Sequence, residues 1–333
     1  RPCLCVCMSE DRLRSIVPMF GGGTSYVDTL DGIVEFVEIH NPTTDELVGW
    51  HRGIFPTVSS RDSIMRRVSY LQQVGFLRQE NGRWVLGQVG REYVQDQRTE
   101  TLLRIMCSRN VGLRSLLYAL SATPMTLAEI SNQQLDTHPE LGWSRGQTDM
   151  ATQRVNWLRS MGLIEKDSDA YSLTSEGRQF VESAVEKWAN TESSPFGGEV
   201  TTGTYETTVH ARMVDPEFRA TVLARHDATC PVSGVDHPGL LDVAHVLSWS
   251  DFPEYRADVS NVLPLSKTHH AAFDRELFTI DRDYRLRVNP VFETESELLQ
   301  RTIIDRAGER MSLRDGSVDQ EYVDQHNASL EWV

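Results

Sequence analysis

Residues 67–94 read RVSYLQQVGFLRQENGRWVLGQVGREYV, and residues 154–181 read RVNWLRSMGLIEKDSDAYSLTSEGRQFV. The two stretches align without a gap at an offset of 87 residues. An internal duplication is the most economical explanation. The identical pairs are Arg67/Arg154, Val68/Val155, Leu71/Leu158, Gly75/Gly162, Leu86/Leu173, Gly90/Gly177, Arg91/Arg178 and Val94/Val181.

Each copy predicts the same order of elements. Apolar residues at helical spacing predict an amphipathic helix that ends at Gly75 or Gly162, where glycine can take a positive φ. Two short strands and a further helix should follow. Upstream, each copy predicts a first helix and then a second one after a proline-bearing turn. The predicted first helices are Leu30–Ile39 and Leu113–Leu120, and the turns contain Pro42 and Pro124.

This order resembles the winged-helix domain. The resemblance implies an α+β chain with two tandem winged-helix domains, over residues 8–98 and 99–190. Winged-helix domains bind DNA through the third helix, but they also serve as protein-interaction modules. We favour DNA and keep both alternatives.

A second motif recurs before each predicted third helix. The first copy has Gly-Trp-His-Arg-Gly at 49–53 and the second has Gly-Trp-Ser-Arg-Gly at 142–146, at an offset of 93 residues. The change of offset predicts a loop, because loops tolerate insertions. A tryptophan could stack on a base or methylated base, and an arginine could contact a phosphate or base edge. Alternatively, each tryptophan covers the core of its domain. The candidate DNA-reading residues are Trp50, Arg52, Trp143 and Arg145.

Four ordered motifs occupy the C-terminal part of the chain. They are Cys230–Gly234, Ala244–Val246, Asn261–Leu265 and His270–Asp274. This stretch resembles the HNH endonucleases, in particular the branch attached to restriction enzymes. The resemblance implies a ββα-metal nuclease domain, which we place at 207–333 after a Ser-, Thr- and Gly-rich linker at 191–206.

The residue chemistry agrees with phosphodiester hydrolysis, which needs a general base and a cation. His245 ends an apolar strand and is the candidate base. His270 and Asp274 are four residues apart on one helix face, so both can reach one ion. The resemblance implies that Asn261 braces the loop between hairpin and helix. We expect His245, Asn261 and His270 to form the catalytic set.

One metal ligand of the wider family is replaced here. Many HNH enzymes have Asp, Glu or His directly before the catalytic histidine, where this chain has Ala244. Asp242 lies two residues earlier on the same strand face and is the natural substitute. The expected ligands are therefore His270, Asp274 and Asp242, which would hold one divalent ion, Mg²⁺ or Mn²⁺. His269 could be a ligand or a phosphate contact.

The cysteines argue against other metal chemistry. No pair of CxxC motifs is present, so we predict no structural zinc, and Cys230 should be a small buried residue in a turn. Three of the five cysteines lie at 1–7, which precede Met8 and which we interpret as a non-native extension. The others are too few for a disulfide framework, which is typical of an intracellular, cytoplasmic protein. No apolar run is long enough to span a membrane.

Charge is distributed unevenly. The net charge is −15, and residues 191–333 contribute 25 of the 48 acidic groups against 13 basic ones. Only three of the 33 basic residues are lysines, which indicates either a halophilic host or a GC-rich genome. Molar salt would screen the acidic field and leave short-range arginine contacts to DNA. The acidic tail at 291–333 should be a solvated surface with a short helix, a glycine turn and a terminal helix.

Two reader domains and a nuclease together resemble modification-dependent restriction endonucleases. Winged-helix readers in such enzymes recognise N6-methyladenine, typically in a palindrome such as GATC. We therefore predict an endonuclease of adenine-methylated double-stranded DNA, which could act as a homodimer. The alternatives are a sequence-specific or mobile-element HNH endonuclease that reads unmodified DNA, and a winged-helix regulator with a degenerate nuclease domain.

Overall fold

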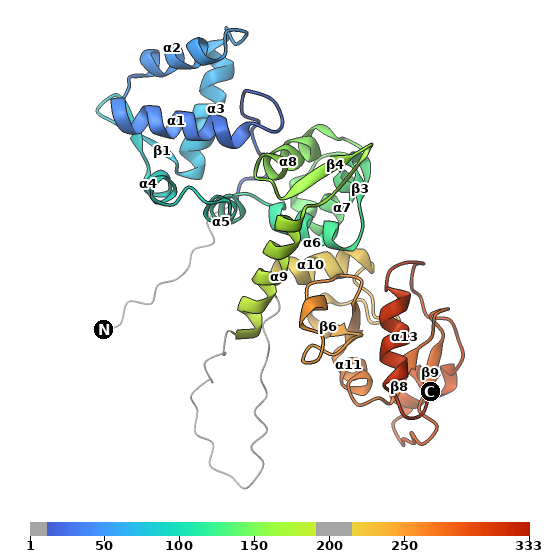
Figure 1. Cartoon of the computed structure of the whole chain (residues 1–333). Coiled ribbons are helices and arrows are strands. Elements are labelled where there is room, and N and C mark those ends of the chain that lie inside the picture. The colour runs from blue at the N-terminus through green and yellow to red at the C-terminus, as the bar shows by residue number, and fades with distance from the viewer. Residues whose placement is uncertain (1–11, 191–214) are drawn as a thin grey trace, which may run out of the picture. The chain divides into compact units, whose positions relative to one another are not determined.

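The computed structural model describes residues 12–190 and 215–333 (Figure 1). The chain divides into two compact units after Arg178. The interpretations of residues 1–7 and of the linker at 191–206 lie outside the described residues. Within the described part, no helix is both long and apolar enough to cross a membrane.

The first repeat is helical, with one small hairpin. Its first helix begins earlier than expected, and its second begins two residues after Pro42. The hairpin is antiparallel and pairs Leu77 with Leu86. The elements are α1 (Tyr26–His40), α2 (Thr44–Ile54), α3 (Arg61–Val74), β1 (Leu77–Glu80), β2 (Arg83–Leu86) and α4 (Gln88–Gln95).

The second repeat has the same order with one additional strand. A linking helix, α5, precedes it, and its three strands form an antiparallel sheet in the order β3-β5-β4. In the first repeat, an isolated bridge between Thr43 and Arg83 stands where β3 meets β5 in the second. The elements are α5 (Thr99–Arg109), α6 (Leu113–Ala122), β3 (Met125–Thr126), α7 (Leu127–Thr137), η1 (Pro139–Leu141), α8 (Asp149–Ser160), β4 (Ile164–Asp167), β5 (Ala170–Leu173) and α9 (Ser175–Asn190).

Two duplicated glycines explain why both repeats fold alike. Gly90 lies in α4 and packs against Phe76, the residue after Gly75. Gly177 lies in α9 and packs in the same way against Leu163. A Cβ at Gly90 would collide with the backbone carbonyl oxygen of Phe76, and one at Gly177 with that of Leu163. Glycine thus lets the last helix approach the start of the hairpin. The second helices are also alike, because each begins with a threonine–glutamate capping box.

The second unit contains the nuclease-like segment. Its core is a buried cluster that includes Cys230, Leu263, Phe278, Tyr284 and Val323. Two antiparallel hairpins, β6–β7 and β8–β9, contribute to this core. The elements are α10 (Pro216–Arg225), η2 (Pro238–Leu240), β6 (Leu241–His245), η3 (Pro253–Tyr255), β7 (Val262–Ser266), α11 (Lys267–Phe273), β8 (Phe278–Ile280), β9 (Leu286–Val288), α12 (Glu297–Thr302), η4 (Ile304–Arg306) and α13 (Gln320–Ala328).

The acidic tail has the predicted helices and glycine turns, but it is not only a solvated surface. Val318 and Val323 are buried in the core, and α13 brings His326 into a stack on Phe273 of α11 at 5.0 Å. The expectation of a purely solvated tail was therefore wrong. Many of its charged side chains are exposed, while apolar side chains spaced along the tail pack into the core.

Candidate active site

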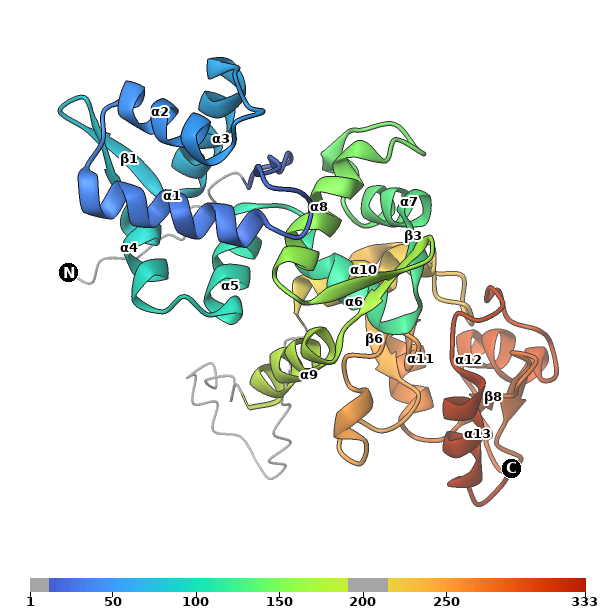
Figure 2. The same cartoon turned by 45° about the horizontal axis from the view of Figure 1, so that its top comes forward.

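A hairpin and the helix that follows it carry the candidate catalytic residues. β6 and β7 pair from Leu241–Ser266 to His245–Val262, and α11 begins directly after β7 with Ser266 as its N-cap. This connection leaves no loop between hairpin and helix. Figures 1 and 2 show α11 beside β6 in both views. The geometry of the site is therefore set by local spacing along one rigid ββα unit.

His270 contacts both of the carboxylates predicted as metal ligands. His270 of α11 points its Nδ1 at Asp242 of β6, 3.6 Å from Oδ2, and its Nε2 at Asp274, 3.5 Å from Oδ2. All three side chains are partly exposed, with 25%, 44% and 59% of their surfaces accessible for His270, Asp242 and Asp274. Substrate can reach them from solvent. Asp242 thus lies beside His270 on the strand face that also carries Ala244, as expected for the substitute carboxylate.

The donor set suits a hard cation, with one restriction. The two carboxylates lie on opposite sides of the imidazole, since each faces a different ring nitrogen. Among residues 12–190 and 215–333, no three His, Cys, Asp or Glu side chains converge as a complete metal site. Mg²⁺ commonly binds through one or two carboxylates, with waters and substrate phosphate oxygens as its other ligands. His270 with one carboxylate fits such a partial site.

His245 ends β6 and is fixed by the loop that follows. Its Nε2 lies 3.0 Å from the backbone oxygen of Arg256, and its ring meets the edge of Trp249 at 5.0 Å. A carbonyl oxygen only accepts, so Nε2 carries the proton and the lone pair of the neutral ring lies on Nδ1. Strand alternation places His245 on the face opposite Asp242 and Ala244.

Asn261 is buried and holds the loop between β6 and β7. Its Oδ1 accepts from the backbone nitrogen of Leu247 at 2.8 Å, and its Nδ2 donates to the carbonyl of Tyr255 at 3.1 Å. We expected it to brace a loop between hairpin and helix, which was wrong because β7 continues directly into α11. Asn261 instead holds together the loop between β6 and β7, which contains the Arg256 carbonyl bonded to His245.

His269 is not a ligand or a phosphate contact. It is 1% exposed, its Nδ1 lies 2.7 Å from Ser266 Oγ, and its Nε2 lies 2.8 Å from Thr302 Oγ1. Burial lowers its pKa, which disfavours the charged form of the ring. His269 therefore joins the start of α11 to α12. Cys230 is fully buried in the turn that ends at Gly234, as predicted.

Two residues around His245 were not predicted from the sequence. Arg256 donates from Nε to the Trp249 carbonyl at 2.6 Å, and its guanidinium lies 5.0 Å from the Trp249 ring centroid. The pair therefore holds the loop around the imidazole of His245. Both residues lie between His245 and Asn261 in the sequence, but their spacing in an irregular loop does not predict that they contact each other.

The tryptophans of the repeated Gly-Trp-x-Arg-Gly motif are not equivalent in the fold. Trp50 lies within α2 rather than in the expected loop, and it stacks on Phe36 of α1 at 5.3 Å. Trp143 does lie in a loop, and its Nε1 donates to Ser131 Oγ of α7 at 3.1 Å. Both rings are half-buried against their own repeat.

The motif arginines also make contacts within their repeats. Arg52 lies in α2 with Trp50 and donates to the Ser59 carbonyl at 2.8 Å, whereas Arg145 forms an ion pair with Asp136. The motif therefore recurs in sequence without recurring in position. These contacts agree with the alternative in which the tryptophans cover the cores of their repeats.

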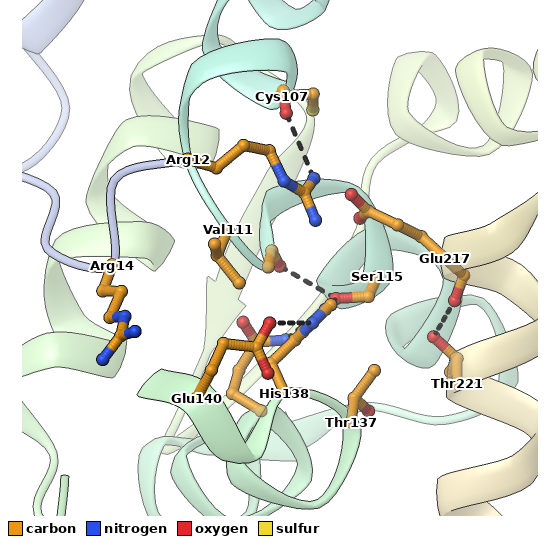
Figure 3. A network of polar contacts seen from close by, with 12 residues as sticks. Arg12, Arg14, Cys107, Val111, Ser115, Thr137, His138, Glu140, Glu217 and Thr221 are labelled. Carbon is orange, nitrogen blue, oxygen red and sulfur yellow. Dashed lines mark hydrogen bonds and ion pairs between the residues drawn. The ribbon is translucent and has the colours of Figure 1, made fainter. Parts of the chain in front are cut away.

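A serine, a histidine and a glutamate also line up in the second repeat (Figure 3). Ser115 Oγ lies 2.8 Å from His138 Nε2, and His138 Nδ1 lies 3.4 Å from Glu140 Oε1. The order is that of a hydrolytic triad, but Ser115 is 0% exposed. A buried hydroxyl cannot meet a substrate, so this network stabilises the packing of α6 on the segment after α7.

The comparisons with known proteins agree with the ββα geometry. Residues 230–281 match the HNH endonuclease family, and this segment contains Asp242, His245, Asn261, His270 and Asp274. No curated protein matches the chain. Residues 230–281 are thus an HNH endonuclease domain, which makes this chain a metal-dependent phosphodiester hydrolase.

Proposed function

We propose that the chain is an endonuclease that cuts double-stranded DNA, with His245 as general base and one Mg²⁺ or Mn²⁺ ion held beside His270. The observation that carries the proposal is the juxtaposition of Asp242, His270 and Asp274 within 3.6 Å contacts, on the same ββα unit that fixes His245. HNH endonuclease domains act on DNA, which gives the substrate class.

The chain's own residues supply the proton transfer. The Arg256 carbonyl holds His245 in the tautomer with Nε2 protonated, so Nδ1 takes the proton from the attacking water. Asn261 keeps that carbonyl in place through the loop. A divalent ion, when bound, neutralises charge on the phosphorane and the leaving oxygen. His270 and a neighbouring carboxylate would hold that ion.

We further propose that both repeats are winged-helix domains and that they bring the nuclease to DNA. The order of three helices, a hairpin and a fourth helix, together with the sheet order β3-β5-β4, supports this assignment. Residues 1–98 carry 11 basic and 12 acidic groups, and residues 99–190 carry 9 and 11. The repeats are therefore almost neutral and repel phosphates less than the acidic second unit does.

The specificity we propose is restriction of adenine-methylated DNA, supported by the combination of reader-like repeats with the nuclease. The packing of Trp50 on Phe36 and of Trp143 on Ser131 favours a second candidate, a sequence-specific endonuclease that reads unmodified DNA. One experiment separates the two. A plasmid prepared with and without adenine methylase is incubated with the protein and Mg²⁺ or Mn²⁺.

Modification dependence predicts cleavage of the methylated plasmid alone. Equal cleavage of both plasmids would support the second candidate, while EDTA should abolish cutting under either. A regulator with a degenerate nuclease domain would cut neither plasmid. Persistence of cleavage in excess chelator would contradict the metal site at His270.

A further inference from the structure

The third helices of the two repeats differ in what covers their outer faces. In α3, Arg66, Ser69, Gln72 and Gln73 are exposed. The offset of 87 residues assigns each of them a counterpart in α8. These counterparts are Gln153, Asn156, Arg159 and Ser160, and all four are only partly exposed.

The N-terminus of α1 covers the outer face of α8. Ser160 Oγ accepts from the backbone nitrogen of Val27 at 2.7 Å, and so satisfies an amide in the first turn of α1. Tyr26 OH donates to Gln153 Oε1 at 3.3 Å and accepts from Asn156 Nδ2 at the same distance. A Cβ at Gly23 would collide with the side chain of Asn156. Close packing of this kind excludes a DNA groove.

The segment before α1 also holds α8. Trp157 is fully buried, and its Nε1 donates to the carbonyl of Val17 at 3.0 Å. Arg154 is fully buried too, and its Nη2 donates to the carbonyls of Arg14 at 2.8 Å and Val111 at 3.1 Å. These bonds tie residues 14–27 to the second repeat. The third helix of that repeat is thus an internal docking surface.

The corresponding face of α3 has the chemistry of a DNA-reading surface. Arg66 offers a forked donor, and Gln72 and Gln73 offer amides that pair with base edges. The face also carries Asp62, while Arg61 is paired with Asp45 at 2.6 Å. Beside it, the turn of the hairpin contains Asn81 and Gly82, both at positive φ.

We infer that each chain reads DNA with α3 of the first repeat alone, and that α8 of the second repeat is a structural helix. The partner is the major groove of double-stranded DNA, which admits one helix. This inference rests on the proposed function, because it presumes a DNA substrate. It replaces two equivalent readers with a single one.

The test compares equivalent triple variants in full-length protein. Both are made in a His245→Ala background, so that DNA is bound without being cut. The first variant is Arg66→Ala/Gln72→Ala/Gln73→Ala in α3, and the second is Gln153→Ala/Arg159→Ala/Ser160→Ala in α8. Fluorescence anisotropy measures affinity for random-sequence duplexes of about three helical turns, roughly 30 base pairs. Thermal unfolding is followed in parallel.

The α3 variant should bind about tenfold more weakly, and its salt dependence should fall by about one counterion, without loss of Tm. The α8 variant should keep its affinity and lose Tm. Equal losses of affinity in the two variants, or no loss in the α3 variant, would overturn the inference. If the α8 triple variant does not fold, Arg159→Ala is compared with Arg66→Ala, and an equal weakening of binding would likewise overturn it.

The reference protein separates this inference from the proposed function. If the His245→Ala chain binds no duplex, the DNA substrate itself is wrong and both proposals fail. If it binds and the α3 variant binds equally well, only the single-reader inference fails. If the protein binds no duplex but binds another protein through the exposed face of α3, that face serves a protein partner and the inference is overturned.

Discussion

The two repeats share a sequence pattern, but their third helices lie in different surroundings. The outer face of α3 meets solvent, whereas that of α8 meets Tyr26 and Val27 of α1. The repeats thus share their internal packing, while the surroundings of their third helices differ. Residues with the same contacts in both repeats should respond alike to substitution, and residues whose surroundings differ should not.

The duplicated glycines should give the largest and most equal effects. Gly90→Ala and Gly177→Ala each place a Cβ against a backbone carbonyl oxygen, which cannot move without shifting the hairpin. Each should destabilise its repeat by about 3 kcal/mol or more. Chemical denaturation measures the change. Gly53→Ala is a suitable control, because a Cβ there meets nothing within 4 Å. A neutral result at either position would contradict the shared packing.

The duplicated arginines should respond unequally. Burial lowers the pKa of Arg154 to about 10, and its guanidinium satisfies carbonyls of the segment before α1. Arg67 is partly exposed and lies 3.8 Å from the Phe20 ring centroid. Arg154→Met should cost about 2 kcal/mol by leaving buried carbonyls without donors, and Arg67→Met about 1 kcal/mol or less. A larger loss from Arg67→Met would reverse the comparison.

The smallest expected difference between the repeats lies in how their stability depends on pH. His51 in α2 and Gln134 in α7 occupy corresponding, fully buried positions, because the capping threonines that begin these helices are Thr43 and Thr126. Burial is the main cause that lowers the pKa of His51 below 6.5, so the unfolded state binds the proton more readily. Stability of the first repeat should fall as pH drops below about 6.5.

His51→Gln installs the residue of the second repeat and should remove this part of the acid sensitivity. Unfolding midpoints between neutral and mildly acidic pH measure the effect. His40→Gln, at an exposed position of α1, serves as the control. If His51→Gln and the parent protein lose stability in parallel on acidification, the buried imidazole is not the titrating group.

Local geometry brings the predicted ligand residues of the second unit into contact. Helical spacing of four residues brings Asp274 to His270, and strand alternation brings Asp242 to the same face. The role of His269 could not be predicted in the same way, since its burial depends on Thr302, which is 33 residues away. The carbonyl of Arg256 beside His245 comes from an irregular loop without a periodic signal.

The repeats show the opposite limit of sequence reasoning. Helices, turns and the hairpin follow from apolar spacing, prolines and glycines, all of which act locally. The loop position predicted for the Gly-Trp-x-Arg-Gly motif was wrong for Trp50, because the shared pattern lies in α2 in one repeat and in a loop in the other. The docking of α1 on α8 joins residues more than 125 positions apart, and nothing local indicates it.

Cleavage of plasmid DNA by matched histidine variants shows whether His245 is the general base. His245→Ala removes the proposed base, while His237→Ala removes an exposed histidine elsewhere in the same domain. With Mg²⁺ or Mn²⁺, the unmodified protein and His237→Ala should cut at similar rates. His245→Ala should bind the plasmid equally well and cut at least about a hundredfold more slowly. Full cleavage by His245→Ala would contradict the account of this site.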